Sequence, residues 1–473
     1  MTKRLIAIAE PSLGLRVEND GLMRSLTGAK LGALGDVLHE HRARLLPLRR
    51  EGIGGDPGVG ISGTDFFSVV ADVVDARALT GALRGAGMLA FDNPRPVRPV
   101  FRSDMRPTGT SPVPQGPTPD LEHLQRYLGL SPEGFDVHEA WRLAGGTGVG
   151  VRIVDVEGGW RLNHEGLAPQ DVGTLGVEDE DQDVAHGTAV LGVLGAARTG
   201  RGTVGIAPNA RLGVCADYLP ETRPFRTTSA AIKETADALQ PGDILVIEAQ
   251  ILPKLLEPLE GATLDRVPYV PVERLPDVWF AIKHATSRGI LVVAAAGNGY
   301  QNLDDPIFDQ PDEGFPLWWR NPFRRGEMDS GSILVGAGAP PLDVPRANAN
   351  EGKDRSRMSF SNYGSAVDAQ GWGDGVATCG YGDLQGSLDE SSLTRWYTAI
   401  FNGTSSATPC VAGALACVQG ILRARGKPIL TPEAARELLR ATGSPQQEDS
   451  ADALGQRIGN RPSILQMLSA LGI

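Results

Sequence analysis

The stretch that decides the fold is Val149-Gly150-Val151-Arg152-Ile153-Val154-Asp155-Val156, a short β-branched run that begins beside a glycine and contains an acidic residue near its end. Runs this short and this apolar are typical of the central strands of a parallel sheet, which are buried on both faces. Similar runs follow at residues 212–216, 244–248, 290–296 and 333–336, with helical patterns at 188–197, 229–239 and 278–288 between them. The sequence therefore predicts an α/β fold with a doubly wound, mostly parallel sheet.

The front of the chain has a different organisation. Residues 1–101 alternate short strand-like and helix-like patterns in the order βαββαβ, which predicts a small α+β domain. Residues 102–121 contain five prolines without hydrophobic periodicity, so we expect an extended, easily cleaved linker. The predicted α/β domain then occupies residues 122–473.

Charge separates the same two parts. The 473 residues carry a net charge of −12, which argues against a nucleic-acid-binding protein because such proteins need a basic surface. Residues 1–110 hold 15 Lys and Arg against 12 Asp and Glu, a net charge of +3, which leaves −15 for the remainder. A basic front part and an acidic body are expected to attract each other.

Cysteine usage and hydropathy narrow the class further. Cys215, Cys379, Cys410 and Cys417 are widely spaced, so neither a disulfide framework nor a zinc site is predicted. No run of 18 apolar residues predicts a membrane span. The N-terminus lacks the pattern of a signal peptide, so the expected location is the cytoplasm, or outside the cell if a leader is missing from this sequence.

The strongest motif is Asn402-Gly403-Thr404-Ser405-Ser406-Ala407-Thr408-Pro409, followed by a run of small apolar residues. It predicts a turn that places Ser405 at the start of a buried helix, where free N–H groups favour a developing negative charge. The alternative is an ordinary N-cap. A serine nucleophile needs a base, and His186 alone among seven histidines opens a comparable small-residue helix.

Two further strand ends complete the predicted site. Asp155 lies on the buried strand 31 residues before His186, and a buried carboxylate there is costly unless it is paired, so we expect Asp155 to orient His186. Asn298 follows the apolar run 290–296 and Gly297, and its amide is placed to donate to an oxyanion. A plain Asn-Gly turn is the alternative for Asn298.

The order Asp155, His186, Asn298, Ser405 resembles that of the subtilisin-like serine peptidases, the subtilases. The resemblance extends to Gly205-Ile206-Ala207-Pro208 and Phe360-Ser361-Asn362-Tyr363-Gly364, and covers about residues 135–470. It implies Ser405 as the nucleophile, His186 as the general acid and base, Asp155 as its partner, and Asn298 with the Ser405 N–H as the oxyanion hole. Hydrolysis of a polypeptide substrate through an acyl-enzyme, without a cofactor, is then expected.

The same resemblance gives residues 1–101 a meaning. Many subtilases carry a small α+β propeptide that assists folding and inhibits the enzyme, so this domain is expected to be an intramolecular inhibitor of a zymogen. Two other functions stay open. One is a peptide cyclase or ligase that uses the same acyl-enzyme, and the other is a catalytically inactive binding protein.

Other residues depart from the family pattern. Glu248 stands where the family often has Ser in its substrate-binding strand, and Gly297 lies where the backbone approaches the substrate. A buried acid at position 248 suggests a preference for a basic residue at P1, against the alternative of a structural Glu paired with an Arg. The acidic run at residues 178–183 is either a structural Ca²⁺ site or a solvated loop, so no metal ligand is assigned.

Overall fold

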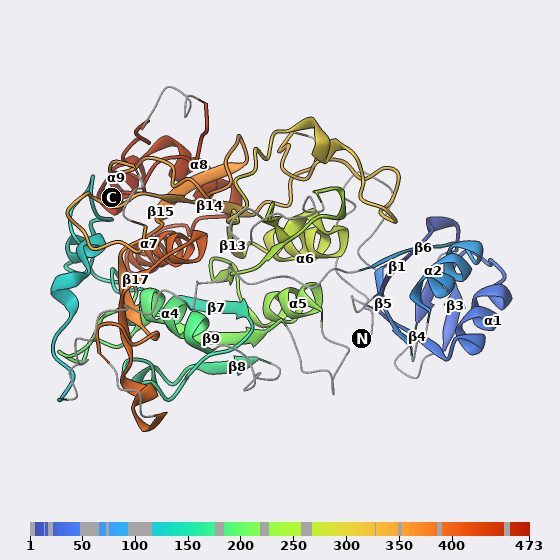
Figure 1. Ribbon diagram of the computed structural model, residues 1–473, viewed down its shortest axis with the longest axis horizontal. Helices are drawn as coiled ribbons and strands as arrows, with labels where there is room; N and C mark the ends of the chain where they lie inside the picture. Colours follow the sequence, from blue (N-terminus) through green and yellow to red (C-terminus); the bar gives the residue numbers. More distant parts are fainter. Residues whose placement is uncertain are drawn as a thin grey trace.

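A computed structural model gives the structure of the protein. It describes residues 5–13, 15–17, 22–47, 66–71, 75–92, 116–175, 184–217, 227–256, 267–326, 328–348, 352–385, 390–448 and 455–473. The chain folds into a small N-terminal domain and a larger α/β body, which lie side by side in Figure 1.

The N-terminal domain is an antiparallel sheet with two helices, as the βαββαβ order predicts. Its sheet has the order β4-β5-β1-β6, and a short hairpin, β2-β3, is added to the expected pattern. The elements are β1 (Leu5–Ala9), β2 (Leu15–Val17), β3 (Met23–Ser25), α1 (Gly32–Glu40), β4 (Ala43–Pro47), β5 (Phe66–Ala71), α2 (Ala76–Gly85) and β6 (Met88–Asp92).

Strand β1 is buried on both faces, which is why all five of its residues are apolar. Leu5, Ala7 and Ala9 pack with residues of α1 and α2 in the core of the N-terminal domain. Ile6 and Ile8 face the other way and join a core cluster of the α/β body. The N-terminal domain is therefore packed against the body through one face of its sheet.

The body is built on seven parallel strands in the order β15-β14-β13-β10-β7-β9-β8. The central strands are apolar because side chains on both faces are covered. The seven strands are β7 (Arg152–Glu157), β8 (Gly173–Leu175), β9 (Arg211–Ala216), β10 (Ile244–Ile247), β13 (Leu291–Ala295), β14 (Ile333–Gly338) and β15 (Val367–Trp372). Two small antiparallel pairs are β11 (Gln250–Ile251) with β12 (Val270–Pro271), and β16 (Val376–Cys379) with β17 (Tyr397–Phe401).

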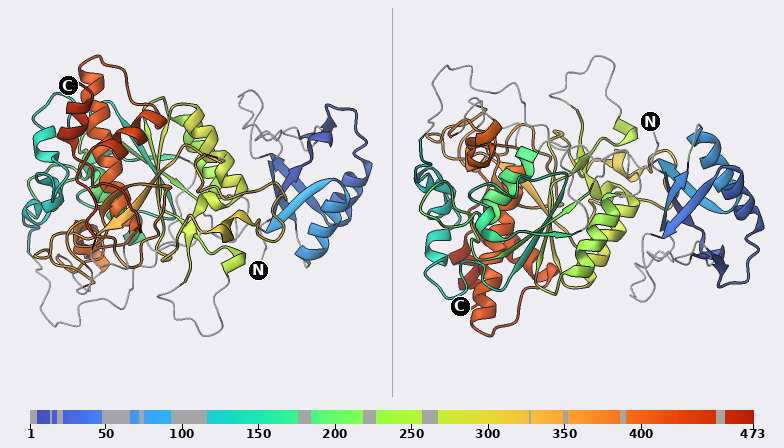
Figure 2. Two further views of the ribbon diagram at one scale, coloured as in Figure 1. Left: turned by 90° about the horizontal axis from the view of Figure 1, so that it is seen from above. Right: turned by 90° about the horizontal axis from the view of Figure 1, so that it is seen from below.

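Helices cover both faces of this sheet, as the two views of Figure 2 show. Helices α5 (Thr228–Ala238) and α6 (Pro276–Ser287) pack on the face nearer the N-terminal domain. The opposite face is covered by α4 (Val184–Gly195) and α7 (Thr404–Ala424). Three further helices, α3 (Val137–Ala140), α8 (Pro432–Ala441) and α9 (Ile464–Ala470), complete the body.

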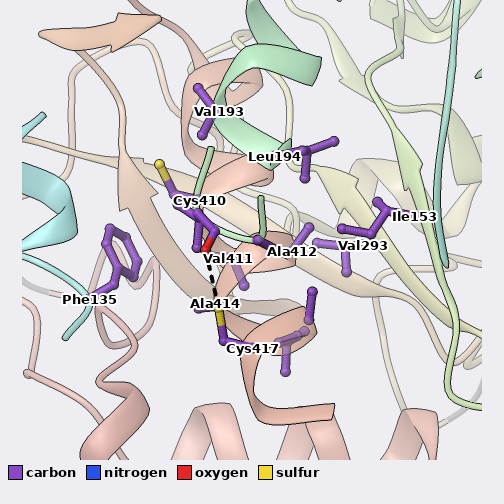
Figure 3. Packing of buried hydrophobic residues seen from close by; sticks show 14 of the residues in the cluster. Phe135, Ile153, Val193, Leu194, Val293, Cys410, Val411, Ala412, Ala414 and Cys417 are labelled. Atoms are coloured by element: carbon purple, nitrogen blue, oxygen red, sulfur yellow. Dashed lines mark hydrogen bonds between the residues drawn. The ribbon is translucent and has the colours of Figure 1, made fainter. Parts of the chain in front are cut away.

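Helix α7 is the centre of the larger core. Figure 3 shows its Cys410, Val411, Ala412, Ala414 and Cys417 among side chains of α4 and of strands β7 and β13. The helix is long and apolar enough to span a membrane, but the apolar window is entirely buried inside the protein. Its small residues allow close packing: a Cβ on Gly420 would lie 2.2 Å from the carbonyl oxygen of Gly145.

The predicted fold class is confirmed. The five predicted central strands are β7, β9, β10, β13 and β14, while β8 and β15, the two edge strands, were not predicted from the sequence. Residues 102–115 of the predicted linker and the acidic run 178–183 lie outside the described residues. The domain boundaries at 101 and 121 therefore stay a prediction.

A substitution of Asp368 on β15 tests how the edge of the sheet is held. It is fully buried, and its carboxylate accepts hydrogen bonds from Arg325, Arg440 and the backbone N–H of Leu334. We expect Asp368→Ala to lower the free energy of unfolding by about 3–5 kcal/mol because it leaves two arginines without their buried partner. Glu139→Ala, which removes an exposed pair with Arg142, should cost less than about 1 kcal/mol. Equal midpoints of chemical denaturation for the two variants would contradict this view of Asp368.

Candidate active site

The candidate site lies where parallel strand ends meet helix N-termini, the usual place for active sites in doubly wound folds. Strand β7 ends at Glu157, β10 is followed by Glu248, and β13 is followed by Asn298. On the covering face, His186 lies in the first turn of α4 and Ser405 in the first turn of α7. The fold thus brings together polar residues that are up to 250 positions apart in the sequence.

His186 is held by Glu157. Its Nδ1 lies 2.8 Å from Glu157 Oε2 and 3.2 Å from Oε1, and both side chains are buried. A carboxylate accepts hydrogen bonds, so it fixes the tautomer that carries the proton on Nδ1 and leaves Nε2 as the acceptor. His186 Nε2 is buried and has no hydrogen-bond partner in the part of the chain that the structure describes. It is therefore available as a base.

The predicted pairing of Asp155 with His186 is wrong. Asp155 is completely buried, and its Oδ2 accepts the indole N–H of Trp160 at 2.7 Å, whereas Oδ1 has no partner. Burial, together with the neighbouring Glu157 carboxylate, raises the pKa of Asp155 well above its usual range. Asp155 lies two residues before Glu157 on β7 and is therefore farther from the strand end and from His186. Its buried position is also unfavourable for a negative charge.

The sequence contained a signal for Glu157. Side chains two positions apart on a strand lie on the same face, so Asp155 and Glu157 both point toward α4 and α7. Glu157 is nearer the strand end and one methylene longer, and it precedes Gly158-Gly159. The packing behind it is tight: a Cβ on Gly187 would lie 2.4 Å from the carbonyl oxygen of Gly159. This contact holds the loop after β7 against the start of α4.

Asn298 lies beside Ser405 as the sequence predicts. Its Oδ1 accepts two hydrogen bonds from Thr404, from the backbone N–H and from Oγ1, both at 2.9 Å. Because a backbone N–H can only donate, these contacts assign the amide oxygen to Thr404 and leave Nδ2 free to donate elsewhere. The preceding Gly297 has φ = +94°, and Gln250 Oε1 accepts the Asn298 N–H. The amide is therefore preorganised next to the first turn of α7.

Ser405 completes the constellation. It is fully buried, and its Oγ has no hydrogen-bond partner among the described residues. Unpaired buried polar atoms are rare, yet they gather here: Ser405 Oγ, His186 Nε2, Asp155 Oδ1 and both carboxyl oxygens of Glu248. Hydrogen bonds between reacting groups are often loose before substrate binds. A serine, a base with the correct tautomer and an amide donor can together perform acyl transfer.

Glu248 is as completely buried as Ser405. Burial first, then the carboxylates of Asp155 and Glu157, raise its pKa well above the usual range. Neither of its carboxyl oxygens has a hydrogen-bond partner among the described residues, so the alternative of a structural Glu paired with an Arg does not fit. The substrate-binding role and the preference for a basic residue at P1 stay predictions.

Other candidates from the sequence lie elsewhere. His164 Nε2 donates to the carbonyl oxygen of Trp396, and burial lowers the pKa of His164 to about 4. His284 lies on α6 and contacts Asp237. Trp318 and Trp319 pack beside Phe280 and Trp279 of α6, not at the site. Within the described residues, no group of three or more His, Cys, Asp or Glu could hold a metal ion.

The fold and this arrangement define a serine peptidase, and comparisons with known proteins agree. The model of the subtilase family matches residues 170–459. An intracellular serine protease of Paenibacillus polymyxa is 25% identical over 67% of this chain and 83% of its own length. Subtilisin BL of Lederbergia lenta is 28% identical over 58% of this chain and 77% of its own length.

Solved structures extend the likeness to the full chain. The epidermin leader peptide processing serine protease of Staphylococcus aureus matches with a TM-score of 0.56 at 15% identity, over 100% of this chain and 99% of that one. The protein belongs to the subtilase family and is a serine endopeptidase. Catalysis in this family needs no cofactor.

Two matched substitutions test the pairing of His186. We expect Glu157→Gln to lower kcat by about 10³–10⁴-fold because an amide no longer fixes the tautomer of His186. Asp155→Asn keeps the hydrogen bond from Trp160 available and should change kcat by less than about tenfold. The measurement is steady-state hydrolysis of a chromogenic peptide. A larger loss of kcat for Asp155→Asn than for Glu157→Gln would support Asp155, and not Glu157, as the partner of His186.

A substitution at Gly403 tests the placement of the Asn298 side-chain amide. It has φ = +96°, and a Cβ there would lie 3.1 Å from Asn298 Nδ2. Gly403→Ala should displace this donor and lower kcat/KM by about 10²-fold, the effect of losing an oxyanion donor. Gly426→Ala is the control, because Gly426 also has a positive φ but has open space around its Cβ position. Similar kcat/KM values for both variants would show that Gly403 matters only for backbone strain.

Proposed function

We propose that the protein hydrolyses peptide bonds through an acyl-enzyme on Ser405 and is made as a zymogen inhibited by its N-terminal domain. The observation that carries the chemistry is the hydrogen bond from His186 Nδ1 to Glu157, because it leaves Nε2 as an acceptor. The Ser405 hydroxyl, in the first turn of the contacting helix α7, also has no hydrogen-bond partner among the described residues. Glu157, His186 and Ser405 then form the triad.

In the first half of the reaction, Ser405 Oγ attacks the peptide carbonyl carbon while its proton passes to His186 Nε2. The developing oxyanion is stabilised by Asn298 Nδ2 and the Ser405 N–H, and the buried Glu157 stabilises the imidazolium. The C–N bond breaks as His186 returns the proton to the leaving amine. In the second half, a water molecule attacks the acyl-enzyme carbonyl and gives a proton to His186. The ester C–O bond then breaks, the carboxylic acid leaves, and His186 returns the proton to Ser405 Oγ.

The contacts of the N-terminal domain with the body, and the opposite net charges of the two parts, support its role as an inhibitor. Phe91 on β6 packs edge-on against Phe315 of the body, with ring centroids 5.1 Å apart. Phe315 belongs to a loop that Arg274 fixes, because its guanidinium donates to the carbonyl oxygens of Phe308 and Gln310 and to Asp312. The complete burial of Ser405 agrees with a precursor whose site is closed.

Self-processing is tested by a pair of serine variants. The wild-type protein should lose about 11–13 kDa on a denaturing gel as the N-terminal 101–121 residues are removed at the predicted linker. Ser405→Ala should stay intact and should not react with a fluorophosphonate probe. Ser406→Ala should be processed normally, because its hydroxyl is bonded to the carbonyl oxygens of Trp372 and Gly403. Processing of Ser405→Ala in the absence of another protease would refute the proposal.

Docking of the N-terminal domain is tested separately. Phe91→Ala should accelerate the loss of the domain several-fold, because it removes an aromatic contact worth about 0.5–1.5 kcal/mol beyond its buried area. Leu26→Ala changes an exposed residue of the same domain and should leave the rate unchanged. The time course of intact chain on a gel measures both. Equal rates would place the inhibitory contact elsewhere.

A further inference from the structure

Glu248 occupies a place in the site that the triad does not use. Parallel pairing aligns Ile247 of β10 with Val156 of β7, so the next residues in register are Glu248 and Glu157. The alternation of side chains puts both on the face toward α7, as it does Asp155. Three carboxyl groups are therefore gathered on two adjacent strand ends beneath Ser405.

The surroundings of Glu248 contain little positive charge. Toward β7 it faces Asp155 and Glu157, and toward α7 it faces Ser405 and Cys410. Burial raises the pKa of the Cys410 thiol to about 12, so this group is neutral. His186 on α4 is the one basic group among these neighbours, and Glu157 already pairs with it. Within the described ranges of the chain, neither oxygen of Glu248 has a hydrogen-bond partner.

These surroundings determine the protonation of the cluster. A buried carboxylate without a partner is unfavourable by several kcal/mol, and the cost grows with each like charge nearby. Glu157 accepts the Nδ1–H of His186, whereas no group among the described residues donates to Glu248, so Glu248 is the carboxyl that holds a proton. A neutral Glu248 can donate, whereas an ionised Glu248 can only accept.

This difference matters because Ser405 lies next to the carboxyl. Ser405 is a neighbour of the Glu248 carboxyl, and no hydrogen bond joins the two groups in the structure. If Glu248 is ionised, the Ser405 hydroxyl turns its proton toward the carboxylate. In that state the serine proton points away from His186, and the base cannot take it. When Glu248 is protonated, its O–H can instead donate to Ser405 Oγ, and the serine proton remains free for His186 Nε2.

Building on the proposed acyl-enzyme chemistry, we infer that Glu248 is a further residue of the active site that works protonated, orienting the Ser405 hydroxyl toward His186, and that its ionisation turns the site off. The active form exists below the pKa of Glu248, and activity is lost as the pH rises through that value. The alkaline limb of the pH profile of activity therefore belongs to Glu248.

The test is the pH dependence of kcat/KM for the processed enzyme on one peptide substrate. Above the optimum, the wild-type value should fall about tenfold per pH unit, the slope of a single titrating group. Glu248→Gln keeps a donor but cannot ionise, so its kcat/KM should change by less than about twofold over the same range. Glu248→Asp keeps a carboxyl and should retain an alkaline limb, with a lower maximum.

Glu273→Gln is the matched control. Glu273 is another buried carboxyl with a raised pKa, but it is bonded to Ser330 and Ser332 and has no contact with the site. Its variant should keep the alkaline limb. An unchanged alkaline limb in Glu248→Gln, or its loss in Glu273→Gln, would overturn the inference.

Labelling separates this inference from the proposed function. The rate of reaction of Ser405 with a fluorophosphonate probe, followed across pH, needs no peptide substrate and should show the same limb in the wild type. If Glu248→Gln does not fold, Glu248→Ser serves in this assay and should lack the limb. A labelled wild type whose limb persists in these variants refutes the role of Glu248 alone. A wild type that is never labelled refutes the role of Ser405.

Discussion

The close packing of helix α7 is the constraint on which the rest of the structure depends. Its residues from Thr404 to Leu422 are buried, so the helix must fit between the sheet, α4 and the segment near Gly145. Small residues make this fit possible: a Cβ on Gly371 of β15 would lie 2.1 Å from the carbonyl oxygen of Ala407. A helix that cannot shift holds the serine in its first turn at a fixed distance from the strand ends.

Much of this arrangement could be predicted from the sequence, because it follows from local patterns. Short apolar runs identified the central strands, and the small-residue helices identified His186 and Ser405 at their starts. Edge strands β8 and β15 were missed because their polar and small residues do not give a continuous apolar run. Asn298 was found because a single strand end fixes its position.

The partner of His186 could not be chosen from motif position alone, because two acids lie on the same face of β7. The choice between Asp155 and Glu157 depends on depth, on side-chain length and on the indole N–H of Trp160 that Asp155 accepts. The burial of Glu248 beside two other carboxyl groups could not be predicted for a related reason, because it depends on the parallel register of β7 and β10.

The four cysteines of the chain are all buried and free of disulfides. The surface of the native protein therefore presents no native thiol to a maleimide reagent. One cysteine introduced at exposed Leu26 and another at exposed Leu342 would be the reactive thiols of the folded protein. A donor and an acceptor dye at these two positions would make the separation of the N-terminal domain from the body directly visible as a change in energy transfer.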